Sequence, residues 1–271
     1  MNKILFVGDL HSRVKHLEYV DRWANDNGIK NVFHVGDFGA LFDPTDCDVM
    51  KYFALRDAAY PEWRFNLGNH DNHRIHGEKT EELRTSGCLT ESTLIPYQRG
   101  LAATQRVQFL PQNGGMLFIA GAVSSDAGPG MRLNAKKEPY YYPGRIQGID
   151  WWAQEAPSQK ELQLFMDLLE DKKPMIVVSH DGFGAHDKLE PKLNTKSNLP
   201  TNYVAQALEK ILELSSHKPR YWFYGHHHKL DYCEIEETTF ACCGKHGEGW
   251  ILDLDDLEIG IEAIPVEVGG V

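Results

Sequence analysis

The chain has 271 residues, of which 42% are apolar, and a formal net charge of −11 at pH 7. This length and apolar content are sufficient for a large buried core. No stretch approaches the roughly 18 consecutive apolar residues of a membrane span, and the N-terminal run lacks the cleavage site of a signal peptide, so we expect a cytoplasmic protein without a membrane partner. The acidic balance disfavours a long nucleic acid as partner, because binding a phosphate backbone needs clustered positive charge.

Short apolar runs predict buried strands, and amphipathic stripes predict helices between them. Strands are expected at residues 4–7, 31–35, 63–67, 116–123, 175–179 and 220–224. Helices are expected at about 14–27, 158–171 and 204–212. The tail predicts an antiparallel group of strands. This alternation of strands and helices indicates an α/β protein in a single domain, 1–271.

Two long segments carry no clear periodicity, about 124–157 and 181–200. The first, an insertion rich in glycine, proline, tyrosine and basic residues, is a candidate substrate lid, because loops of this length in a compact domain are usually functional or mobile. Within it, Arg132, Lys136 and Arg145 are candidate substrate-binding residues, since phosphate recognition often uses cationic side chains. A solvated surface loop is the equally weighted alternative.

Five of the predicted strands run directly into residues of metal-ligand type. These residues are Asp9 and His11; Asp37; Asn69, His70 and Asp71; His180; and His226 and His228. Open α/β sheets bind their ligands outside the carboxyl ends of the strands. In four of the five cases a glycine precedes the polar residue, and glycine lets the backbone turn sharply and approach a bound group.

The donor types favour a pair of metal ions. Asp9 and His11 are two positions apart, as are His226 and His228, so each pair would project to one side of an extended segment. His227 would point away. Carboxylate, imidazole and amide donors without thiolate suit manganese, iron or zinc. Seven such groups exceed the needs of one ion, and two ions that share a carboxylate are a standard arrangement for displacement at phosphorus.

In their order along residues 8–228, these blocks resemble the signature motifs of the calcineurin-like metallophosphoesterases. The blocks are Asp9-x-His11, Gly36-Asp37, Gly68-Asn69-His70-Asp71, His180 and Gly225-His226-x-His228. The resemblance implies a two-sheet β-sandwich flanked by helices, in four layers α/β/β/α. The protein Ser/Thr phosphatase branch of the family is disfavoured, because Phe38 and Gly39 follow Asp37 where that branch carries an acidic residue and then Arg-Gly.

The resemblance also implies a role for each residue. One metal would be held by Asp9, His11, Asp37 and His228. The other would be held by Asp37, Asn69, His180 and His226, with Asp37 bridging the two ions. A hydroxide between the ions would attack phosphorus, His70 would act as general acid or stabilise charge at the leaving group, and Asp71 would orient His70.

The expected function is therefore a dinuclear metal-dependent phosphoesterase acting on a phosphate monoester or diester of a small or compact substrate. Manganese is the first candidate metal, with iron, zinc and nickel after it. A non-catalytic metal-binding scaffold of the same fold, a nuclease and a protein phosphatase remain as alternatives. Isolated histidines such as His34, His73 and His76 have no ligand spacing, so they are expected to be ordinary core or surface residues.

Overall fold

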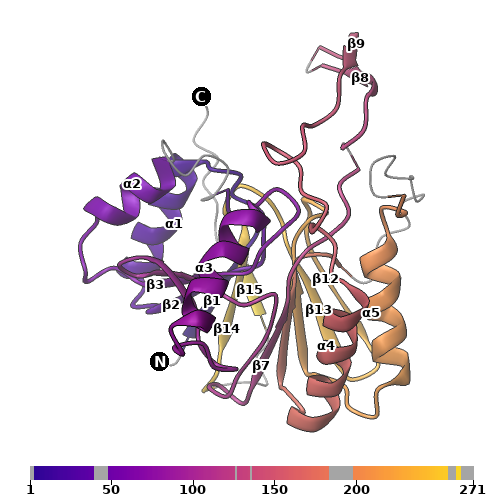
Figure 1. Ribbon diagram of the computed structural model, residues 1–271. Coiled ribbons are helices and arrows are strands. Elements are labelled where there is room, and N and C mark those ends of the chain that lie inside the picture. The colour runs from indigo at the N-terminus through magenta and orange to yellow at the C-terminus, as the bar shows by residue number, and fades with distance from the viewer. Residues whose placement is uncertain are drawn as a thin grey trace.

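The structure is a computed structural model that describes residues 3–39, 48–125, 127–134, 136–182, 198–255 and 261–263, without the side chains of residues 132, 133 and 261–263. Two β-sheets pack face to face, and helices cover the outer face of each (Figure 1). The predicted α/β fold with two sheets flanked by helices is confirmed.

The first sheet has seven strands in the order β15-β14-β1-β2-β3-β5-β4. They are β1 (Lys3–Val7), β2 (Asn31–His34), β3 (Glu62–Phe65), β4 (Ile95–Gln98), β5 (Leu101–Ala103), β14 (Gly249–Asp253) and β15 (Ile261–Ala263). Strands β1, β2, β3 and β5 run parallel to one another. Their carboxyl ends therefore meet along one edge of the sheet.

The second sheet has six strands in the order β12-β13-β11-β10-β7-β6. They are β6 (Val107–Leu110), β7 (Met116–Ile119), β10 (Ile176–Ser179), β11 (Tyr221–Tyr224), β12 (Leu230–Ile235) and β13 (Thr238–Cys243). Strands β7, β10, β11 and β13 are parallel. This sheet thus also gathers the ends of several parallel strands at one edge.

Five helices are described: α1 (Val14–Asp26), α2 (Asp48–Leu55), α3 (His73–Thr85), α4 (Gln159–Lys172) and α5 (Tyr203–Leu214). The first three lie on the side of the first sheet, and α4 and α5 cover the second (Figure 1). Helix α4 begins with the capping box that its sequence predicts, in which Ser158 and Glu161 exchange side chain to backbone hydrogen bonds. No helix in the described part of the chain is both long and apolar enough to span a bilayer.

Three buried apolar clusters separate the four layers. In β1, Leu5 and Val7 join the cluster beneath α1 and α2, whereas Ile4 and Phe6 join the cluster between the sheets. This alternation follows from the two-residue period of a strand. Phe6 stacks on Phe223 of β11 with ring centroids 3.8 Å apart. The direct ring contact brings the two sheets together next to the loops that follow β1 and β11.

Two expectations about secondary structure need correction. The tail strands do not form one antiparallel group, because β13 belongs to the second sheet and pairs with β11 in parallel, while β14 and β15 extend the first sheet. The insertion is not wholly irregular, because it contains a hairpin of β8 (Gly130–Leu133) and β9 (Pro139–Tyr142) that projects from the body (Figure 1). Of the second irregular segment, residues 183–197 lie outside the described residues.

Candidate metal centre

The polar residues that follow the strands meet where the carboxyl edges of the two sheets come together. His228, after β11, places its Nε2 atom 3.1 Å from Asp9 Oδ2, after β1. His180, after β10, places its Nε2 atom 3.4 Å from Asp37 Oδ1, after β2. The structure thus joins residues from both sheets, some of them more than two hundred positions apart in the chain.

The loops that carry these residues are not extended. Four of the candidate ligands have positive φ angles: His11 (48°), Asp37 (57°), His226 (66°) and His228 (57°). The expectation that Asp9 and His11 converge by strand alternation is therefore wrong, since a left-handed turn at His11 brings the two side chains together. Left-handed backbone at non-glycine residues is uncommon and strained, and it concentrates at functional sites.

Glycines give the ligands room to approach one another. A β-carbon at Gly68 would overlap the Asp37 carboxylate, and one at Gly225 would overlap Asp9 Oδ1. Gly36, at φ 131°, leaves the space that the His180 ring occupies. Gly36, Gly68 and Gly225 are therefore each required by a ligand of a neighbouring loop, and Gly36 also by the positive φ of its own backbone.

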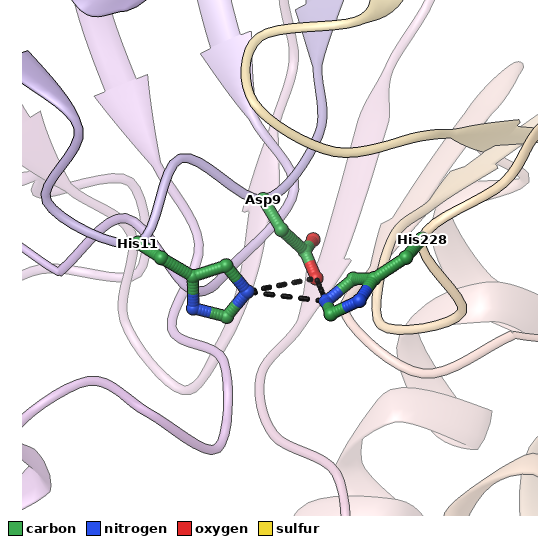
Figure 2. Close-up of side chains that lie close together, drawn as sticks. All are labelled: Asp9, His11 and His228. Atoms are coloured by element: carbon green, nitrogen blue, oxygen red, sulfur yellow. Dashed lines mark hydrogen bonds and ion pairs between the residues drawn. The ribbon is translucent and has the colours of Figure 1, made fainter. Parts of the chain in front are cut away.

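Asp9, His11 and His228 form the open group (Figure 2). Figure 2 shows both imidazoles pointing at the Asp9 carboxylate, and the two Nε2 atoms are 3.1 Å apart. His11 Nε2 lies 3.8 Å from Asp9 Oδ2. The side chains of His11 and His228 are 25% and 46% exposed, so solvent and substrate can reach this group.

Asp37, Asn69 and His180 form the buried group. His180 Nε2 lies 3.0 Å from Asn69 Oδ1, and all three residues are almost inaccessible to solvent. Asp37 also connects the two groups, because its Oδ2 atom is 3.9 Å from His11 Nε2 in the open group. The ring of His226 flanks His180 at a centroid distance of 5.2 Å, and its backbone N–H donates to Asp9 Oδ1.

The carboxylates make this region favourable for positive charge. Burial disfavours a charge on His180, but the carboxylates of Asp37 and Asp9 outweigh burial and raise the pKa of His180 to about 9. Burial likewise opposes the charge of Asp37, yet the charge and hydrogen bond of the His180 imidazole hold the pKa of the Asp37 carboxyl well below its usual value. A cation in this region would supply the positive charge that the buried carboxylates otherwise draw from a proton.

These residues fit a pair of metal ions. Metal–ligand bonds of about 2.0–2.2 Å place neighbouring donor atoms roughly 3.0–3.6 Å apart, close to the shortest spacings in both groups. The buried Asp9 Oδ2 faces His228 Nε2 at 3.1 Å without a well-aligned hydrogen bond, so its lone pairs are available to a cation. Oxygen and imidazole donors without thiolate exclude a structural zinc cluster of the cysteine type and suit a catalytic centre.

A family comparison agrees with this chemistry. The model of the calcineurin-like phosphoesterases matches residues 2–230. The chain belongs to this family. It is therefore a hydrolase acting on phosphoester bonds, and members of the family typically bind two metal ions.

Solved structures resemble this phosphoesterase in fold. The protein TT1561 of Thermus thermophilus is 15% identical with a TM-score of 0.52, and the match covers 97% of this chain and 98% of that one. Another solved chain is 12% identical with a TM-score of 0.57 and the same coverage. At such low identity these matches show the fold alone. A comparison with curated proteins gives no match.

His70 of the phosphoesterase faces both the metal ligands and the insertion. Its backbone N–H donates to Asp37 Oδ1 at 2.7 Å, and its Nε2 atom lies 3.8 Å from Asp37 Oδ2. The buried guanidinium of Arg145 reaches the same imidazole, with Nη2 2.8 Å from His70 Nε2. Because a guanidinium only donates, His70 Nε2 accepts this hydrogen bond.

Asp71 holds two loops of the site together. Its Oδ1 atom accepts from the backbone N–H of Gly39 and its Oδ2 atom from that of Gly68, both at 2.8 Å. Burial, and then the charge of Asp37, raise the pKa of Asp71 to about 7. The hydrogen bonds described for Asp71 run to backbone, so its proposed orienting effect on His70 would act through these loops and remains a prediction.

The three candidate substrate-binding residues differ in position. Arg145 is buried against His70. Lys136 is exposed in the turn of the projecting hairpin, and Arg132 lies on β8 of the same hairpin (Figure 1). Only Arg145 is thus placed at the candidate metal centre by a described contact.

Sequence inspection missed two polar residues behind the metal ligands. Ser124, just beyond β7, accepts a hydrogen bond from Asn69 Nδ2, and buried Glu155 holds Ser124. The available signal was positional, since Ser124 is a polar residue just beyond another parallel strand of the second sheet. His227, expected to point away from its two neighbours in the triplet, places its Nε2 atom 3.2 Å from Asp181 Oδ1.

Proposed function

We propose that this phosphoesterase hydrolyses a phosphate monoester or diester of a small or compact substrate at a dinuclear metal centre. The first ion would be held by Asp9, His11, Asp37 and His228. The second would be held by Asp37, Asn69, His180 and His226. The observation that carries the proposal is the position of Asp37, whose carboxylate lies within 4 Å of an imidazole in each group.

The two ions, when bound, would lower the pKa of a water and neutralise charge on the phosphate. The protein would provide the geometry. Asp37 links the open group to the buried group, because its carboxylate lies 3.9 Å from His11 Nε2 and 3.4 Å from His180 Nε2. The exposed open group leaves one side of the centre accessible, and a compact phosphate ester would bind there. Manganese is the first candidate metal, followed by iron, zinc and nickel.

His70 would deliver a proton to the leaving group or stabilise its charge. Its side chain is 27% exposed and lies beside Asp37, so it can contact both the centre and an incoming substrate. In the present arrangement Nε2 accepts from Arg145 and carries no proton to donate. We propose that the Arg145 guanidinium donates instead to a substrate phosphate oxygen, which frees His70 Nε2. The freed Nε2 atom would take up a proton from solvent, to which this side chain is 27% exposed, and then pass it to the leaving-group oxygen.

A turnover screen tests the proposal. Protein stripped of metal and reloaded with Mn²⁺, Fe²⁺, Zn²⁺ or Ni²⁺ would be assayed on p-nitrophenyl phosphate, its bis-ester and a panel of nucleotides. We expect metal-dependent release of product from at least one of these three substrate classes. The ratio of the rate on p-nitrophenyl phosphate to the rate on its bis-ester would separate a monoesterase from a diesterase. Two bound ions without turnover on any compact ester would overturn the proposed activity.

For Arg145, the comparison of Arg145→Lys with Arg145→Met tests the phosphate contact. Both variants remove the bidentate fork, but only lysine keeps the charge. We expect KM to rise more in Arg145→Met than in Arg145→Lys, with metal content unchanged. Equal KM values in both variants and the parent protein would exclude this contact.

A further inference from the structure

The two ends of the insertion meet directly behind one metal-ligand candidate. Ser124 stands at its start and Glu155 near its end. The backbone N–H of Ser124 donates to Glu155 Oε1 at 2.9 Å, and the Ser124 hydroxyl lies 2.5 Å from Glu155 Oε2. Both residues are buried. The backbone supports the same junction, because Ala122 N–H donates to the Glu155 carbonyl.

This junction continues to the metal centre through Asn69. The side-chain Nδ2 of Asn69 donates to Ser124 Oγ at 2.9 Å. The other end of the same amide, Oδ1, lies 3.0 Å from His180 Nε2 in the buried group. An unbroken line of hydrogen bonds therefore runs from Glu155 through Ser124 to the amide.

The direction of these hydrogen bonds decides which end of the amide faces the centre. Burial raises the pKa of Glu155 to about 7, so this carboxyl is ionised above that pH. An ionised carboxylate only accepts, so the Ser124 hydroxyl then donates its single proton to Glu155. The Ser124 oxygen then has only lone pairs to offer the amide of Asn69. Of the two ends of that amide, the NH₂ end alone can donate to them. The carbonyl end must consequently point at the buried group, and that end alone can bind a cation.

We propose that Glu155 and Ser124 are positioning residues that fix the orientation of the Asn69 amide and so prepare the buried subsite for its metal ion. The inference rests on the proposed dinuclear centre. It also assigns a role to the insertion, whose two ends become part of the wall behind the metal centre. Mutation of a residue that hydrogen-bonds to a metal ligand in this way commonly lowers metal affinity or activity by about 10- to 100-fold.

Calorimetric titration of metal-free protein with Mn²⁺ tests this role independently of turnover. We expect Ser124→Ala and Glu155→Gln to weaken one of the two Mn²⁺ sites roughly 10- to 100-fold and to leave the other within a few-fold. Ser124→Thr keeps the hydroxyl and should restore most of the affinity. Glu161→Gln is the matched control, because Glu161 pairs with Arg106 instead and should leave both Mn²⁺ affinities unchanged.

A double-mutant cycle separates positioning from general destabilisation. If Glu155 acts through the amide, Glu155→Gln should weaken Mn²⁺ binding in the parent protein but add almost nothing in an Asn69→Ala background. Additive losses in the cycle, or parental Mn²⁺ affinity in both Ser124→Ala and Glu155→Gln, would overturn the inference. A parent protein that binds two Mn²⁺ ions but hydrolyses nothing would refute the proposed activity while leaving this test intact.

Discussion

Two neighbouring regions use histidine in opposite ways. His70, at the metal centre, is partly exposed beside the Asp37 carboxylate. His73 and His76 follow within the first turns of α3 and are buried. His73 Nε2 donates to the Gly68 carbonyl while Nδ1 accepts from Arg106, and burial together with Arg106 lowers the pKa of both α3 histidines.

The difference lies in the neighbours and not in the residue type. Carboxylates next to the imidazoles of the metal centre favour positive charge, so a cation can bind there. Burial and a nearby guanidinium keep the α3 histidines neutral. Both ring nitrogens of His73 make structural hydrogen bonds, and His76 Nδ1 lies 3.2 Å from the Tyr97 hydroxyl. The same side chain is thus a candidate ligand or catalyst in one region and a packing residue in the other.

The largest effect is expected when the carboxylate that joins the two metal groups loses its charge. Asp37→Asn should lower kcat/KM by more than about 100-fold and reduce the metal content, because loss of a direct ligand exceeds the cost of losing its supporting partners. Elemental analysis alongside kinetics checks both parts. Full metal occupancy would contradict the bridging assignment.

Asp21→Asn is the matched control for that change. Asp21 is equally buried but binds Arg56, Tyr52 and the Trp63 indole away from the centre. Loss of this paired charge should lower the melting temperature. Metal content and kcat should stay close to the parental values.

Removal of the imidazole at the centre should separate catalysis from metal binding. His70→Ala is expected to reduce kcat by about 10²- to 10⁴-fold, the usual range for a general acid, with both ions retained. Steady-state kinetics at saturating Mn²⁺ would measure this loss. The α3 variant His76→Gln should leave kcat unaltered, and parental turnover in His70→Ala would rule out its role as general acid.

A methyl group at Gly68 should disturb the centre without changing any ligand. The added β-carbon overlaps Asp37, so Gly68→Ala should weaken Mn²⁺ binding by about tenfold or more, with calorimetry as the measurement. Gly77→Ala in α3 meets open space and should stabilise the protein by up to about 1 kcal/mol. Unchanged Mn²⁺ affinity in Gly68→Ala would mean that the loops relax around the methyl group.

The last effect leaves metal binding and turnover unchanged and concerns only the pH dependence of stability. Burial, and then Arg106, lower the pKa of His76 to about 3, against an ordinary value of 6.5. Between these values the unfolded chain binds the proton and the folded chain does not, so His76 destabilises the fold by about 1.4 kcal/mol per pH unit as the pH falls below 6.5. His76→Gln should flatten this slope in urea unfolding between pH 6.5 and 4.5. An identical slope in both proteins would show that His76 becomes protonated in the folded state.

The sequence alone was sufficient to predict the fold class and the family. Apolar runs such as 4–7 and 175–179 are long enough to be strands and too short to be helices, and the residues after them are of metal-ligand type. The candidate ligands could be proposed from the sequence because each group of them follows a predicted strand within a short stretch of chain. The lack of ligand spacing around His34, His73 and His76 predicted ordinary core or surface residues, and all three are buried.

Only the tertiary structure decided how these residues meet. The left-handed turns at His11 and Asp37, the fit of His180 over Gly36, and the contact of Arg145 with His70 depend on packing between segments far apart in the chain. The support of Asn69 by Ser124 and Glu155 has the same origin. Local patterns report which face a residue buries, whereas hydrogen-bond partners across two sheets are set by how those sheets pack.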